Sequence, residues 1–322
     1  MTRFAIPDLS ALTDTAPAAA LGVSDSGRRS TATSGDVDEH SVFRIASLTK
    51  TFTAVATLRA ARSADVALST PVRRVLPGLV DGWVADTDIT IEHLLAQTSG
   101  LTPAVTGADA ATVGEGDDAL VAACRLVVAQ GSDRRPGARW EYYNGNYFLA
   151  GAVTAELMSC SFEDALEQLV LTPAGLRETS FAAPASLVPG YADGSLVPED
   201  GYPRARRPSG GLTSTVDDLL RFVEHLLADR ELIETISTRR TQDGDPMRYG
   251  FGWAIGPSGQ LYLNGRLAGY RTALLALPET GTAAVALAND AGALPAIARV
   301  LSDIQLGATG DDLAEAIDAF AA

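Results

Sequence analysis

One stretch limits the folds open to this chain more than any other: residues 51–61 read as a helix that needs covering on nearly every side. No charged side chain precedes Arg59 in the run TFTAVATL at positions 51–58. A helix without a polar face is stable only when other elements bury it. We therefore expect this helix at the centre of the molecule, enclosed by the rest of the 322-residue chain.

The residue just before this helix, Lys50, is the single lysine of the sequence, and every other Lys or Arg position holds arginine. Arginine stays protonated in proteins, whereas a desolvated lysine can lose its proton and act as a base. Ser47 lies three positions earlier, on the same face of a helix and at its positive N-terminal end. An arginine-rich composition could leave one lysine anywhere, so the pair alone leaves a chance coincidence open.

Composition and charge limit the classes of partner, the cellular location and the cofactors that we expect for this chain. The formal net charge of −15 argues against nucleic acid or an anionic membrane as a partner, and leaves a small molecule. We find no signal-peptide pattern and no long apolar run, so a cytoplasmic location is the default expectation. Cys124 and Cys160 read as small buried hydrophobes. The three scattered histidines show no metal-ligand spacing, and no dinucleotide fingerprint occurs, so we expect neither metal nor cofactor.

The order of predicted elements indicates an α+β fold, an α/β sandwich. Strand-like segments occur near both ends of the chain, and helical spacing dominates the middle. Terminal strands can pair into one antiparallel sheet flanked by helices, with the middle as an inserted, mostly helical lobe. We place the sheet domain at residues 1–60 and 205–322, the helical domain at 61–204, and the site in the cleft between them. Residues 88–101 read as one helix capped by Thr90.

Two further clusters carry polar and aromatic side chains. Residues 140–147 (WEYYNGNY) follow a Pro-Gly turn, and a phenol there that lies near an ammonium loses its proton more easily. Residues 262–270 (YLNGRLAGY) form a strand whose glycines permit close approach of a ligand to the backbone. An aromatic packing cluster and a plain bulged edge strand are the structural alternatives.

Taken in order, these clusters resemble the serine β-lactamase and penicillin-binding-protein superfamily, whose signatures include S-x-x-K and K-T-G. The resemblance is to its class C β-lactamase-related branch, which includes esterases and D-aminopeptidases. It is carried by residues 43–52, 89–101, 136–151, 171–181, 210–218, 249–253 and 265–289. It implies a β-lactamase/transpeptidase-like fold.

The resemblance also implies roles for individual residues. Ser47 is the nucleophile, Lys50 its partner and Tyr142 the general base, while Asn144 orients the substrate or Lys50. The backbone N–H groups of Ser47 and Arg266 form the oxyanion hole. The further substrate-binding residues on the same strand are Asn264 and Gly265.

One departure from the pattern bears on the substrate. The third motif normally begins with lysine or histidine, but here the run is Leu263-Asn264-Gly265, so the usual cation for a substrate carboxylate is missing. This favours an esterase or amidase over an efficient β-lactamase. Arg266 or Arg271 could substitute by proximity. A lesser departure is Gln97, where the branch usually shows histidine.

We therefore expect a serine hydrolase that forms a Ser47 acyl-enzyme with an ester, amide or lactam of a small molecule. A transacylase with the same intermediate is the first alternative, because the shape of the cleft determines whether water, an amine or an alcohol takes the acyl group. A non-catalytic binding protein that kept the fold is the second, and the intact set of Ser47, Lys50, Tyr142 and Asn144 argues against it. The sequence leaves the oligomeric state open.

Overall fold

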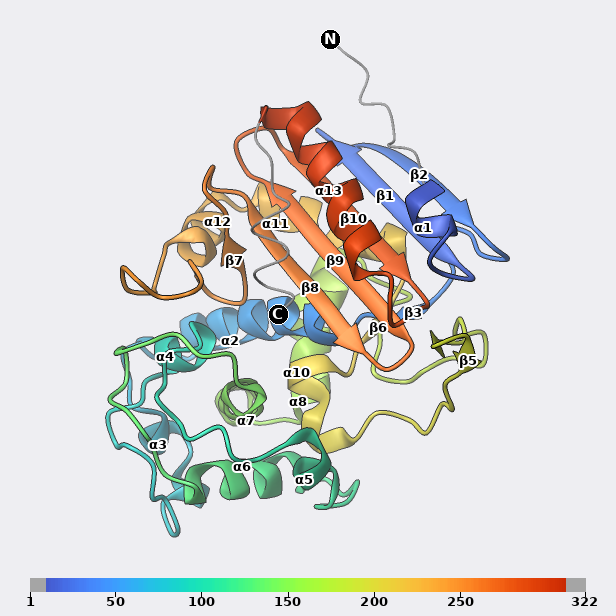
Figure 1. The fold of residues 1–322 in the computed structure, drawn as a ribbon. Helices are drawn as coiled ribbons and strands as arrows, with labels where there is room; N and C mark the ends of the chain where they lie inside the picture. The colour runs from blue at the N-terminus through green and yellow to red at the C-terminus, as the bar shows by residue number, and fades with distance from the viewer. Residues whose placement is uncertain (1–9, 311–322) are drawn as a thin grey trace.

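A six-stranded antiparallel sheet forms the upper half of the molecule in Figure 1. The computed structural model describes residues 10–310. In spatial order the strands are β2 (Arg28–Ser34), β1 (Ala19–Asp25), β10 (Thr282–Ala288), β9 (Tyr270–Leu277), β8 (Leu261–Leu267) and β7 (Ala254–Ile255). The central strands read as continuous apolar runs because both of their faces are covered, whereas the edge strand β2 is largely exposed. Strands from the two ends of the chain meet where Ala19 pairs with Ala288.

Helices cover both faces of this sheet. α13 (Leu294–Thr309) crosses in front of β9 and β10 in Figure 1, and α11 (Val216–Ala228) lies behind β1 and β10. Gly22 of β1 allows α11 to pack closely, because a Cβ at this position would lie 2.3 Å from Cγ1 of Val216. The predicted α+β architecture, an antiparallel sheet flanked by helices, is confirmed.

The apolar helix predicted at the centre is α2 (Thr49–Ser63), which lies between the sheet and the helices below it (Figure 1). Twelve of its residues are buried. The ring of Phe52 stacks on Phe222 of α11 at a centroid distance of 3.8 Å. On another side the Thr57 hydroxyl lies 2.8 Å from that of Thr154 on α7 (Asn144–Met158). α2 therefore joins the sheet to the helical region, and our division of the chain into two domains stays a prediction.

The remaining elements are short and mostly belong to the helical region. The helices are α1 (Ser10–Thr13), α3 (Val72–Val75), α4 (Ile91–Leu95), α5 (Gly107–Ala111), α6 (Ala119–Ala129), α8 (Phe162–Leu166), α9 (Thr172–Ala174), α10 (Arg207–Gly210) and α12 (Arg230–Ser237). Single turns are η1 (Ala46–Leu48), η2 (Pro77–Leu79), η3 (Glu167–Leu171) and η4 (Arg204–Arg206). Two small ribbons pair β3 (Phe43–Arg44) with β6 (Thr213–Ser214) and β4 (Tyr191–Ala192) with β5 (Ser195–Leu196).

The helix predicted over residues 88–101 is shorter than expected. Thr90 is its N-cap, as predicted, and its hydroxyl accepts a hydrogen bond from the His93 N–H. The helix ends at Leu95 because Gln97 has a left-handed backbone conformation, with φ of 60°. A non-glycine residue in this region ends a helix and is held there by tertiary contacts. Those contacts belong to the candidate site.

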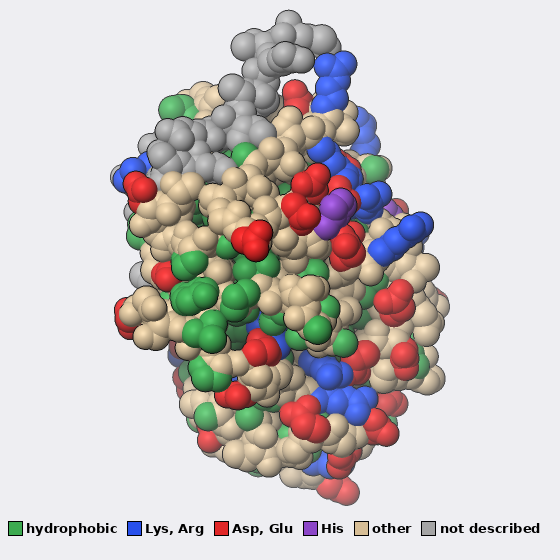
Figure 2. Space-filling view, turned by 90° about the vertical axis from the view of Figure 1, so that its right-hand side faces the viewer, with side chains coloured by type: hydrophobic (Ala, Val, Ile, Leu, Met, Phe, Trp, Pro, Cys, Tyr) green, Lys and Arg blue, Asp and Glu red, His purple; other side chains and the backbone are tan. Residues whose placement is uncertain are grey.

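The distribution of charge on the surface and the length of the apolar helices both bear on possible partners. On the face shown in Figure 2, acidic and basic side chains are interspersed, so the net charge of −15 does not give this face a single sign. None of the helices between residues 10 and 310 combines the length and the apolar character needed to cross a bilayer.

The close packing of β1 on α11 gives a stability prediction. Gly22→Ala places a methyl group against buried Val216 and Leu220, so we expect the free energy of unfolding to fall by about 1–3 kcal/mol. Urea denaturation measures this change. Gly78→Ala is the control, because nothing lies within 4 Å of its added Cβ, and its effect should stay within about 0.5 kcal/mol. Equal effects of the two changes would contradict the packing argument.

Candidate active site

Ser47 sits on the turn η1, where the chain passes from β3 into α2. It is the only residue of positions 42–58 that is not buried. Ala46 before it has a left-handed φ of 49°, which costs about 1–3 kcal/mol for a residue with a Cβ. The Thr49 hydroxyl donates to the Ala46 carbonyl at 2.7 Å and holds the strained turn. The local fold thus exposes this one side chain of a buried segment.

The strand β8 lies directly against this turn. A Cβ on Gly265 would lie 2.6 Å from the Ile45 carbonyl oxygen and 2.2 Å from the Thr272 hydroxyl. The Thr272 hydroxyl itself donates to the Ile45 carbonyl at 3.0 Å and fastens β9 to η1. Glycine at position 265 therefore permits the close approach of β8 to the residues that carry Ser47.

Lys50 is fully buried one helical turn after Ser47, with 0% of its surface exposed. Its Nζ lies 3.3 Å from Ser47 Oγ and donates to the Ser209 carbonyl at 2.6 Å. No described carboxylate forms an ion pair with it. Burial first, and then the positive charge of Arg206, lower the pKa of Lys50 well below its ordinary value. A neutral amine beside Ser47 can accept the hydroxyl proton.

Tyr142 completes the contact set around Ser47. Its hydroxyl donates to Ser47 Oγ at 2.8 Å, and Lys50 Nζ lies 4.8 Å from its ring centroid. Burial raises the pKa of the Tyr142 phenol above its ordinary value, although the hydrogen bond with Ser47 opposes this. The direction is opposite to the one we expected for a phenol near an ammonium. A lysine whose own pKa is lowered supplies little positive charge to ionise its neighbour.

The other predicted site residues lie on two elements. Asn144 is the first residue of α7 and is half-buried, two positions after Tyr142. Asn264, Gly265 and Arg266 follow one another on β8, with Asn264 half-buried and Arg266 exposed. The Asn264 side-chain nitrogen is buried without a hydrogen-bond partner among the described residues. Ser47, Lys50 and Tyr142 are thus in mutual contact, and the substrate-binding roles of the other residues stay predictions.

Gln97 holds the loop that carries Tyr142, a role that the sequence did not reveal. Its backbone carbonyl accepts from the Glu141 N–H at 2.9 Å, and its side-chain Oε1 accepts from the Tyr143 N–H at 3.0 Å. The same Oε1 accepts from the Asn146 side chain at 2.6 Å. Gln97 therefore fixes the backbone on both sides of Tyr142. The only signal in the sequence was its departure from the histidine usual at this position.

The segment at residues 202–210 also reaches the site. Ser209 receives the Lys50 hydrogen bond through its carbonyl, and its hydroxyl donates to the Arg206 carbonyl at 2.9 Å. The Arg206 guanidinium lies 4.9 Å from the ring centroid of Tyr202. The cluster Arg204-Ala205-Arg206-Arg207 was visible in the sequence, but which of its charges would remain unpaired was not.

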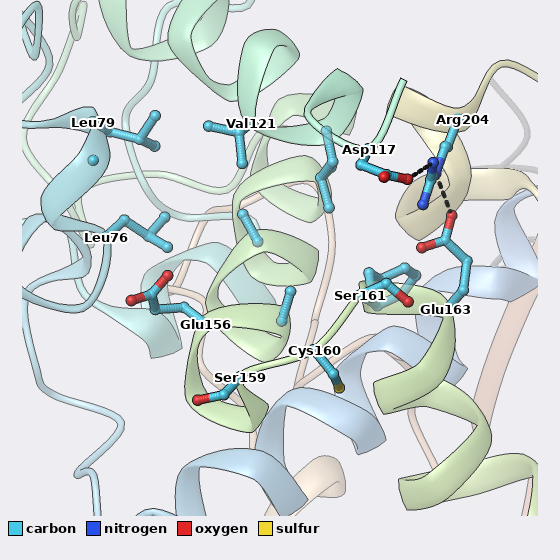
Figure 3. A pocket seen from close by; sticks show the side chains of 15 residues that line it. Leu76, Leu79, Asp117, Val121, Glu156, Ser159, Cys160, Ser161, Glu163 and Arg204 are labelled. Carbon is cyan, nitrogen blue, oxygen red and sulfur yellow. Dashed lines mark hydrogen bonds and ion pairs between the residues drawn. The ribbon is translucent and has the colours of Figure 1, made fainter. Parts of the chain in front are cut away.

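A cavity of about 540 Å³ lies elsewhere, on the far side of α7 in the helical region (Figure 3). Apolar side chains such as Leu76, Leu79 and Val121 form much of its wall. On its rim Arg204 is ion-paired with Asp117 at 2.5 Å and with Glu163 at 3.1 Å. None of the lining residues belongs to the Ser47 site. No group of three side chains suited to a metal occurs among the described residues.

The hydrogen bonds between Gln97 and the two neighbours of Tyr142 predict a loss of stability and of labelling rate when the Gln97 side chain is changed. Gln97→Met keeps the size of the side chain but removes the acceptor for the Tyr143 N–H, which should cost about 1–3 kcal/mol of stability. Because Tyr142 is then less well held, we also expect slower covalent labelling of Ser47 by a fluorophosphonate. Gln97→Glu retains an acceptor oxygen and should lose less in both urea denaturation and labelling rate. Equal losses in the two variants would contradict the claim that the Gln97 side-chain oxygen holds the loop of Tyr142.

Comparison with known proteins was made against this geometry. The family model described as Beta-lactamase matches residues 9–305. Penicillin-binding protein 4 of Amycolatopsis lactamdurans is 31% identical over 60% of this chain and 52% of its own length. Esterase EstB of Burkholderia gladioli is 30% identical over 68% of this chain and 66% of its own. The alignment thus spans about half to two thirds of these relatives.

Solved structures agree with the predicted fold. A D-stereospecific amidohydrolase from Streptomyces sp. matches with a TM-score of 0.75 and 25% identity, over 88% of this chain and 95% of that one. A β-lactamase/D-alanine carboxypeptidase from Pseudomonas syringae matches with a TM-score of 0.78 and 18% identity, over 92% and 96%. These structures confirm the β-lactamase/transpeptidase-like fold. With its family model covering almost the whole described chain, this protein belongs to the Beta-lactamase family.

Proposed function

We propose that the protein is a serine hydrolase that acts through an acyl-enzyme on Ser47, with an ester, amide or lactam of a small molecule as substrate. The observation that carries this proposal is the position of Ser47 Oγ, 3.3 Å from the Lys50 amine and 2.8 Å from the Tyr142 hydroxyl. Relatives named esterase and amidohydrolase support hydrolysis as the reaction.

The first chemical step is proton removal from Ser47. The Tyr142 hydroxyl already donates to Ser47 Oγ, so the serine's own proton is directed elsewhere, and the neutral Lys50 amine is the acceptor within reach. Oγ then forms a bond to the substrate carbonyl carbon, whose oxygen gains the negative charge. We propose that the backbone N–H groups of Ser47 and Arg266 hold this oxyanion. One such donor is worth about 3–4 kcal/mol.

Collapse of the tetrahedral intermediate breaks the bond to the leaving group, which needs a proton. We assign this proton to Tyr142, because burial raises its pKa and keeps the phenol protonated. The Lys50 ammonium then passes the proton taken from Ser47 to the Tyr142 phenolate, so that both groups return to their neutral state. This assignment differs from the base role that the family resemblance implies. Water finally attacks the acyl carbon and gives a proton to the neutral Lys50 amine. The bond between the acyl carbon and Oγ then breaks, Oγ regains that proton from Lys50, and the acid is released.

The substrate is more plausibly an ester or amide than a penicillin or cephalosporin. Leu263 occupies the position of the usual third-motif cation and is only 1% exposed, so it offers a β-lactam carboxylate no positive charge. The named esterase and amidohydrolase relatives point in the same direction.

The nucleophile assignment has a direct test. A fluorophosphonate should label Ser47 covalently, and Ser47→Ala should abolish the label. The same change should lower the rate of p-nitrophenyl ester hydrolysis by roughly 1,000-fold or more. Mass spectrometry of the labelled peptide identifies the residue. Ser63→Ala, at the far end of α2, is a control that should label normally. A label on any residue other than Ser47 would reject the mechanism.

The proton acceptor gives a second test. Lys50→Arg keeps a long basic side chain but cannot give a neutral base, so we expect it to lose nearly as much activity as Ser47→Ala. In the native enzyme, kcat/KM should rise with pH through the lowered pKa of Lys50, well below the ordinary range of a lysine. The groups facing Nζ are Tyr142, Tyr147 and Arg206. An active Lys50→Arg enzyme would overturn the base assignment.

A further inference from the structure

Arg206 differs from its neighbours in the sequence because its guanidinium forms no ion pair with a described carboxylate. Arg204 is paired with Asp117 and Glu163 (Figure 3), and Arg207 is paired with Glu163 at 2.5 Å. These three ion pairs hold η4 and α10 against the helical region on both sides of Arg206. A half-buried cation is thus held in a fixed place without a counter-charge.

This cation lies beside the catalytic groups. Its charge acts on the Lys50 amine, and its backbone carbonyl accepts from Ser209, whose own carbonyl accepts from Lys50. Its guanidinium stacks over Tyr202. The Tyr202 hydroxyl lies against Gly210, and a Cβ on Gly210 would be 2.5 Å from that hydroxyl and 3.7 Å from the Ala46 carbonyl carbon. Arg206 and Tyr202 therefore border the turn that carries Ser47.

The described contacts of the Arg206 guanidinium are packing contacts and include no hydrogen-bond acceptor. One face lies on the Tyr202 ring, and the Gly107 backbone approaches so closely that a Cβ there would lie 2.7 Å from Cζ of Arg206. Contacts of this kind fix the plane of a guanidinium but do not satisfy its N–H donors. Five N–H groups in a rigid fork match the two oxygens of a carboxylate.

The other two candidate cations are less well placed. Gly265 and its cross-strand partner Thr272 face the Ser47 turn, as the hydrogen bond from Thr272 to Ile45 requires. Side chains alternate along a strand, so the neighbouring pair Arg266 and Arg271 points to the opposite face of the sheet. The Arg271 guanidinium also donates to the Leu267 and Tyr270 carbonyls, at 3.1 and 2.8 Å.

We propose that Arg206 binds a carboxylate of the substrate. It would supply the positive charge that the third motif lacks, because Leu263 stands where lysine or histidine is usual. The substrate class is then an anionic acyl compound, with its carboxylate on either the acyl group or the leaving group. This inference rests on the proposed hydrolase function and narrows it. Arg206 acts as a specificity residue and takes no part in proton transfer.

Two pairs of esters test the proposal and distinguish the position of the carboxylate. Mono-p-nitrophenyl glutarate is compared with p-nitrophenyl valerate, which lacks a charge on the acyl group. 3-Acetoxybenzoate is compared with 3-acetoxybenzamide, which lacks it on the leaving group. We expect the native enzyme to prefer the anionic member of one pair. Arg206→Gln should lower that preference in kcat/KM by about 10- to 100-fold, mainly through KM.

The ratio within a pair is the decisive quantity. Loss of the Arg206 charge also changes the pKa of Lys50, but this acts equally on both members of a pair and cancels in the ratio. Arg74→Gln removes one exposed positive charge on α3, and its ratios should equal those of the native enzyme. This control separates a local effect from a change in net charge.

A second variant keeps the arginine but moves it. Gly107→Ala places a methyl group where the guanidinium lies, and the flexible end of Arg206 must shift. It should lower the same ratio, and it decides the matter if Arg206→Gln does not fold. Ratios unchanged in these variants, or no preference for either anionic ester, would overturn the role of Arg206 while ester hydrolysis continued. Absence of all hydrolysis and of Ser47 labelling would overturn the proposed function as well.

Discussion

The structure of the site depends on the burial of one amine without a counter-charge. Transfer of the Lys50 ammonium out of water is costly, and no described carboxylate offsets that cost. The free energy is lowered when Lys50 loses its proton, which is the state a base needs. Arg206 adds to the effect through its positive charge. The surrounding helices therefore do more than enclose α2, because the desolvation they impose lowers the pKa of Lys50 and favours its neutral form.

Several backbone features maintain this arrangement at some cost in stability. Ala46 and Gln97 both have left-handed conformations that residues with a Cβ rarely adopt. Each lies beside a reactive group, since Ala46 precedes Ser47 and Gln97 holds the loop of Tyr142. Strain of this kind persists where neighbouring contacts determine the conformation. Here those contacts are the Thr49 hydroxyl at Ala46 and the two neighbours of Tyr142 at Gln97.

The sequence predicted what depends on local pattern and spacing. The helical spacing of Ser47 and Lys50 and the apolar character of residues 51–58 were enough to place Lys50 on a buried helix, with Ser47 one turn before it. The strands at the two ends also pair as expected. The role of Gln97 was out of reach, because hydrogen bonds to backbone N–H groups leave no residue pattern. The raised pKa of Tyr142 depends on burial by distant segments. The unpaired state of Arg206 likewise depends on where Asp117 and Glu163 fold.

The single lysine also has a consequence for the chemistry of the protein surface. Because Lys50 is fully buried, no exposed side chain carries a primary amine, and guanidinium groups supply the positive charge of the arginine-rich exterior. Guanidinium groups remain protonated and are poor nucleophiles at neutral pH. Reagents that depend on a lysine amine, such as aldehydes that form imines, therefore find no lysine on the outside of the folded molecule.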